Sequence, residues 1–142
     1  MGALETALCC REILLDGILF WSPVSRAYEC FMHLLGKERF TYGMAGNNVD
    51  FMGDRIGREF FRDIKDNPLD GIAAIKDFEK PVYFIHGDAD TDVLPENSER
   101  YMEVLPHAER KFVRGAGHGY DGWEKQDDLW KYSKEYIRRI MK

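Results

Sequence analysis

The sequence has few cysteines, no long apolar run and no excess of basic residues. Its three cysteines, two of them adjacent at Cys9 and Cys10, are too few for a disulfide framework and suit a reducing, cytoplasmic setting. No apolar run could span a bilayer, and no charged-then-apolar leader is present. Acidic residues outnumber basic ones by 25 to 20, and this negative balance argues against nucleic acid as a partner. A soluble globular chain remains, and 142 residues suit one domain with its own core.

Apolar runs alternate with helical patterns along most of the chain. Residues 17–21 and 82–85 are nearly continuous apolar runs, as expected for strands that are buried on both faces. Residues 110–113 are more polar and indicate an edge strand. Helical spacing predicts helices over 97–104 and 123–141. This order favours an α/β fold, with a parallel sheet covered by helices on both faces.

The segment from about 23 to 68 departs from this alternation. Apolar residues at helical spacing predict a helix over 28–35 that is stopped by Gly36. Residues 40–43 and 49–53, separated by the turn signal Gly46-Asn47-Asn48, indicate a short hairpin, and a further helix is expected over 56–64. We therefore interpret the chain as a single, partial domain, 1–142, with an insertion at about 23–68.

Two loops carry residues that are typical of a catalytic triad. His86-Gly87-Asp88-Ala89-Asp90 follows the apolar run 82–85, and Gly115-Ala116-Gly117-His118-Gly119-Tyr120 follows the run 110–113. An acid after one strand and a histidine after the next form the second half of the chain order Ser…Asp…His. The first half, a serine in Gly-x-Ser-x-Gly, does not occur in this sequence.

These motifs resemble the C-terminal half of the α/β-hydrolase family, and within it the cinnamoyl/feruloyl-type esterases and acylaminoacyl-peptidase-like serine hydrolases. The pattern His-Gly-x-x-Asp-x-x-Val matches His86, Gly87, Asp90 and Val93, and Gly-x-Gly-His-Gly-aromatic matches the second loop. The resemblance implies carboxylic-ester hydrolysis by a Ser-His-Asp triad, with an ester or amide as substrate and no cofactor or metal. It implies His118 as the base, His86 as structural, and the insertion at about 23–68 as a cap over the active site.

The acid is one of three aspartates in a single short loop. Asp88, Asp90 and Asp92 alternate, so at most one is expected to point at His118, because a second nearby carboxylate would raise the pKa of one of them. The family pattern selects Asp90. Its expected role is to fix the imidazole tautomer and to stabilise the imidazolium ion.

The resemblance also gives a reading of the first residues. Met1 matches the residue after the family's serine, Gly2 the closing glycine of its elbow, and residues 3–14 the helix that follows. On this reading the half that carries the nucleophile is absent, and one oxyanion donor, the Met1 nitrogen, is an amine instead of an amide. The alternative is that Met1-Gly2 is an ordinary start and the likeness is accidental.

No other residue is a convincing nucleophile. Ser22 and Ser25 lie where the cap begins, Ser98 and Ser133 are expected in helices, and Cys9 and Cys10 lie on the helix behind the elbow. The chain alone is therefore expected to be inactive, and to self-associate through the 17–21 edge or to pair with its missing half. Two alternatives stay open: a non-catalytic interaction module, and a half-enzyme complemented by another chain.

Overall fold

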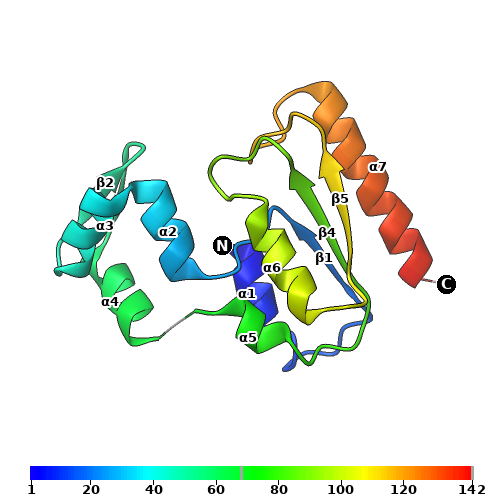
Figure 1. The fold of residues 1–142 in the computed structure, drawn as a ribbon, viewed down its shortest axis with the longest axis horizontal. Helices are drawn as coiled ribbons and strands as arrows, with labels where there is room; N and C mark the ends of the chain where they lie inside the picture. Colours follow the sequence, from blue (N-terminus) through cyan, green and yellow to red (C-terminus); the bar gives the residue numbers. More distant parts are fainter. Residues whose placement is uncertain (68, 142) are drawn as a thin grey trace.

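A computed structural model, which describes residues 1–67 and 69–141, shows a three-stranded parallel sheet (Figure 1). Its strands are β1 (Ile18–Trp21), β4 (Val82–Gly87) and β5 (Glu109–Val113), in the order β1-β4-β5. Every residue of β4 is buried, which explains its unbroken apolar run, whereas β5 is mostly exposed. The predicted strands and the edge position of the third are confirmed.

Helices cover both faces of the sheet. On one face lie α1 (Gly2–Cys9), α5 (Gly71–Ile75) and α6 (Glu96–Val104), whose core includes Phe20 and Phe84 with stacked ring centroids 5.4 Å apart. The long helix α7 (Trp123–Ile140) covers the other face, where Tyr136 stacks on Tyr83 at 5.0 Å. Neighbouring residues of β4 thus enter opposite cores, as alternation along a strand requires.

The segment between β1 and α5 forms a body of its own beside the sheet (Figure 1). It contains α2 (Ala27–Leu35), α3 (Lys37–Met44), the antiparallel pair β2 (Val49–Phe51) and β3 (Asp54–Ile56), and α4 (Arg58–Asp66). Its core holds Leu35, Phe40, Val49 and Phe61. The two ends of the segment meet where Arg26 and Asp70 form an antiparallel bridge and an ion pair of 2.9 Å.

Two details of the sequence prediction are wrong. Residues 40–43 lie in helix α3, and the hairpin is β2–β3 with its turn at Met52-Gly53, where both residues have positive φ. In this helix Phe40 and Gly43 lie three residues apart on one buried face, and both pack against Phe61 of α4. Helix α1 ends at Cys9 instead of continuing to residue 14. Residue 68, the end of the predicted insertion, lies outside the described residues.

Candidate active site

Asp90 and His118 meet at the carboxyl ends of two neighbouring parallel strands. Asp90 lies in the loop after β4 and His118 in the loop after β5, and His118 Nδ1 donates to Asp90 Oδ2 over 2.9 Å. Asp90 is only 2% exposed, whereas the side chain of His118 is 45% exposed. The contact expected from the sequence is present, and it leaves Nε2 of His118 free to act as a base.

The loop after β4 turns around the Asp90 carboxylate. Its Oδ1 accepts hydrogen bonds from the backbone N–H groups of Asp92 at 3.1 Å and Val93 at 2.9 Å. The carboxylate is therefore held by its own loop on one oxygen while the other faces His118. Asp88 instead accepts from the backbone N–H of Gly115 at 2.5 Å, and Asp92 is exposed. Of the three aspartates, only Asp90 is hydrogen-bonded to His118.

The two loops are joined directly by backbone hydrogen bonds. The N–H of Asp88 donates to Val113 at 3.2 Å, and that of Ala89 donates to Ala116 at 3.0 Å. At Gly87 the chains come so close that a Cβ would lie 2.2 Å from the carbonyl oxygen of Ala116. The glycine of the His-Gly pair is thus required by the approach of the histidine loop.

The charges of the pair support each other. Burial alone would raise the pKa of Asp90, but hydrogen bonds from His118 and His86 outweigh it and hold that pKa well below its usual range. The hydrogen bond to Asp90 raises the pKa of His118, against the opposing effect of burial. The carboxylate therefore stays ionised at neutral pH and stabilises the imidazolium that forms when His118 takes a proton.

His86 lies outside the triad pattern but contacts the same carboxylate. It is fully buried, with Nε2 2.8 Å from the carbonyl oxygen of Val93 and 3.4 Å from Asp90 Oδ2, and with Nδ1 hydrogen-bonded to the Ser98 hydroxyl. Because a carbonyl only accepts, Nε2 carries the proton, and Nδ1 accepts from Ser98. Sequence analysis assigned His86 a structural role and did not predict its contact with Asp90, although the sequence shows that the two residues are four positions apart.

The serines of the chain are all buried, and each hydroxyl is occupied away from His118. Their partners are Tyr120 for Ser22, Asn97 for Ser25, His86 for Ser98, and Trp21 and Leu129 for Ser133. Cys10 donates to the Ala7 carbonyl, and Cys9 is exposed. Within the described residues, therefore, no side-chain hydroxyl or thiol is hydrogen-bonded to the imidazole.

The first residue lies near the pair. Met1 is the N-cap of α1, and the chain begins at the end of α1 nearer the tips of the strands (Figure 1). The positive charge of its amine acts to lower the pKa of His118, although the effect of Asp90 prevails.

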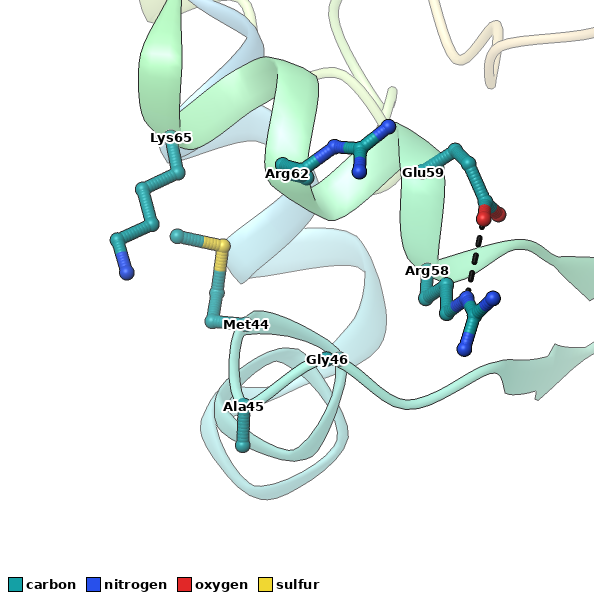
Figure 2. A pocket seen from close by; sticks show the side chains of 8 residues that line it. Met44, Ala45, Gly46, Arg58, Glu59, Arg62 and Lys65 are labelled. Carbon is teal, nitrogen blue, oxygen red and sulfur yellow. Dashed lines mark hydrogen bonds and ion pairs between the residues drawn. The ribbon is translucent and has the colours of Figure 1, made fainter.

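Cavities in the described part of the chain include two in or beside the body between β1 and α5, and neither of these two is lined by His118. One, of about 420 Å³, lies between α3 and α4, where Arg58, Arg62 and Lys65 surround Met44 and the loop after α3 (Figure 2). The other, of about 460 Å³, separates α2 from the aspartate loop and α6; Glu29, Cys30, Met32, His33, Asp92, Leu94, Glu96, Asn97 and Arg100 line it. This second cavity adjoins the loop of Asp90.

Over 1–67 and 69–141, no three histidines, cysteines, aspartates or glutamates are grouped to hold a metal ion. No helix in those ranges has the length and apolar character needed to cross a bilayer.

Comparisons with known proteins were informative at the level of structure. No family model matches the chain, and no curated protein sequence matches it. Similar solved structures include Est1E from Butyrivibrio proteoclasticus, with a TM-score of 0.77 and 19% identity over 98% of this chain and 57% of that one. The esterase domain of a Rhodothermus marinus protein is similar with a TM-score of 0.70 and 15% identity, over 97% of this chain and 56% of that one. Pyrococcus horikoshii acylaminoacyl peptidase is also similar, with a TM-score of 0.69 and 14% identity over 98% of this chain and 22% of that one.

The chain thus spans little more than half the length of the first two structures. At these identities the likeness concerns the fold, and it covers nearly all of this chain. It agrees with the parallel sheet, the helices on both faces and the two loops at the strand ends. The part of the chain that the structure describes has the α/β-hydrolase fold, as the sequence predicts.

Proposed function

We propose that the chain belongs to a serine hydrolase of the α/β-hydrolase family, in which Asp90 and His118 are the acid and base of a Ser-His-Asp triad. The observation that carries the proposal is the hydrogen bond of 2.9 Å between them, at the carboxyl ends of adjacent strands. The buried, ionised carboxylate and the half-exposed imidazole have the environments that these two roles need. A serine from outside these 142 residues supplies the nucleophile.

The proposed chemistry is carboxylic-ester hydrolysis in two steps. His118 Nε2 takes the proton of the serine as its oxygen attacks the ester carbonyl, and Asp90 stabilises the imidazolium. The same proton passes to the leaving alkoxide when the ester bond breaks, which gives an acyl-enzyme and an alcohol. Water then attacks the acyl group with His118 again as base, which releases the acid and restores the serine.

The neighbourhood of the amino terminus supports this proposal. In the family the serine immediately precedes the helix that corresponds to α1, and Met1 follows it. Met1 is the N-cap of α1, and the chain begins at the end of α1 nearer the carboxyl ends of the strands, which is the side where Asp90 and His118 lie (Figure 1). The four serines of the chain offer no substitute, because their hydroxyls are buried and engaged elsewhere.

We further propose that the insertion at about 23–68 acts as the cap. Its residues Val24, Ala27, Cys30 and Ile64 share a buried cluster with Val93, so the insertion packs against the aspartate loop. The cavity of about 460 Å³ between α2 and that loop lies at this contact. It is a candidate for holding part of an ester substrate, since binding sites combine an apolar lining with a few polar groups.

The first test is the nucleotide sequence upstream of the Met1 codon. An in-frame segment that encodes Gly-x-Ser directly before Met1 is the expected result. Stop codons at that place would contradict the proposal and favour a standalone interaction module.

The second test is the hydrolysis of p-nitrophenyl acetate. The 142-residue chain should show no turnover above background, because it has no activated hydroxyl. In the enzyme that includes the upstream segment, His118→Ala should remove nearly all activity and Asp90→Asn should lower it strongly. His107→Ala is the matched control, because His107 is exposed and contacts Lys80 at the other end of the sheet. Activity of the short chain that His118→Ala abolishes would overturn the assignment of the nucleophile.

A further inference from the structure

Two buried residues near His118 have backbone conformations that side chains rarely adopt. Ser22 has φ 42° and Tyr120 has φ 51°, and both are 5% exposed. The remaining non-glycine residue with positive φ in 1–67 and 69–141 is Met52, in the exposed turn between β2 and β3. Backbone strain of this kind persists only where surrounding contacts impose it, and it is concentrated at functional sites. The positive φ values of Ser22 and Tyr120 therefore indicate that contacts around them impose these conformations.

The side chains of these two residues are joined. The Tyr120 hydroxyl donates to the carbonyl oxygen of Ile85 at 3.0 Å and lies 2.9 Å from the hydroxyl oxygen of Ser22. Since the Tyr120 proton is used on the carbonyl, Ser22 donates to the Tyr120 oxygen. The backbone N–H of Ser22 also donates to the Ile85 carbonyl, at 2.9 Å. One hydroxyl thus connects the end of the histidine loop to β1 and β4.

The histidine loop is hydrogen-bonded to the aspartate loop just before His118, and its next attachment to the sheet comes only at Tyr120. Ala116 is bound to the aspartate loop, since its carbonyl accepts from Ala89. His118 itself lies between Gly117 and Gly119, and glycine restricts the backbone least. The next point that is fixed to the sheet is Tyr120. Burial raises the pKa of Tyr120 to about 12, so its hydroxyl keeps the donated proton at neutral pH.

We propose that Tyr120 is a positioning residue for His118, whose hydroxyl, held by Ile85 and Ser22, fixes the glycine-rich loop so that the imidazole stays against Asp90. The catalytic meaning of this placement rests on the proposed function, whereas the placement itself can be measured without any substrate. Ser22 immediately precedes the insertion, so the same contact also links the histidine loop to the start of the proposed cap. The two residues at its ends are the two buried residues with positive φ described above.

The test compares Tyr120→Phe with Tyr136→Phe in the 142-residue chain. Each change removes one buried hydroxyl that donates to a carbonyl, but Tyr136 donates to Pro81, at 2.7 Å, beside the opposite end of β4. The pKa of His118 is measured by NMR titration, with circular dichroism and thermal melting to confirm folding. We expect Tyr120→Phe to lower this pKa towards the ordinary value of about 6.5. Tyr136→Phe should leave it at the wild-type value.

A folded Tyr120→Phe chain with the wild-type pKa at His118 would overturn the proposal. If that variant does not fold, Ser22→Ala decides, because it removes one of the two partners of the Tyr120 hydroxyl. It should lower the His118 pKa by a smaller amount, and an unchanged value again overturns the proposal. Asp90→Asn gives the reference for an imidazole without its carboxylate. The hydrolase function is judged separately, by the upstream sequence and by ester turnover.

Discussion

Replacing Asp90 by asparagine should destabilise the chain more in mild acid than in mild alkali. Asparagine keeps the volume and one acceptor oxygen, so the backbone N–H groups of Asp92 and Val93 keep their partner. What is lost is the negative charge beside His118, whose pKa the hydrogen bond to Asp90 raises. For a raised pKa, the added stability is fully present below the unfolded value of about 6.5 and is lost as the pH rises through the folded value.

The size of this effect follows from the exposure of the two partners. One unit of pKa difference corresponds to about 1.4 kcal/mol. The His118 side chain is 45% exposed, however, and solvent-exposed ion pairs contribute only about 0.2–1 kcal/mol. Because the Asp90 carboxylate is buried, the pair belongs at the upper end of that range. We expect Asp90→Asn to cost about 1 kcal/mol more at about pH 6 than at about pH 9.

Urea unfolding followed by tryptophan fluorescence at these two pH values measures the difference. Asp88→Asn is the matched control, because Asp88 is in the same loop but accepts from the Gly115 backbone instead of from a histidine. Its loss of stability should be the same at both pH values. An equal loss for Asp90→Asn at both would refute the reasoning, since it would mean that the carboxylate does not stabilise the protonated imidazole.

Two further predictions concern the sheet. Gly87→Ala should destabilise the chain by about 2–3 kcal/mol in urea unfolding, because the new Cβ meets the backbone oxygen of Ala116, whereas Gly2→Ala has open space and should change little. An unchanged urea midpoint for Gly87→Ala would contradict this prediction, because it would mean that the aspartate and histidine loops can move apart without loss of stability. Among the described residues, strand Ile18–Trp21 pairs on one side only, with β4, so the pure chain should self-associate in size-exclusion chromatography with light scattering. A stable monomer with a sharp cooperative melt would count against this edge as a contact surface.

The sheet and the acid-base contact could be predicted because each depends on a local pattern. A strand buried on both faces is expected to be a nearly continuous apolar run, and β4 is one over residues 82–85. Parallel strands end at the same edge of a sheet, so an acid after one and a histidine after the next are brought together. The choice of Asp90 among three aspartates came from the family motif, because spacing alone left the three equivalent.

The errors and omissions have a different origin. Residues 40–43 include Phe40 and Tyr42, which favour strands, yet they lie in a helix whose buried face, at Gly43, packs on the ring of Phe61. That contact joins residues 18 positions apart and leaves no periodic signal. The Ser22–Tyr120 contact, over 98 positions, is equally invisible to pattern reading. Sequence periodicity reports which face of an element is buried, but it does not report the partner.

The sheet order also explains why Asp90 is buried and His118 is accessible. Strand β4 lies between two others and is buried throughout, so the loop that it carries can hold Asp90 at 2% exposure with donors on both oxygens. Strand β5 lies at the edge, and its loop leaves His118 half-exposed, which agrees with the role proposed for it. An edge loop is less constrained by the core, and fixing it needs contacts at both of its ends. The Ala89–Ala116 hydrogen bond supplies the first, and the Tyr120 hydroxyl the second.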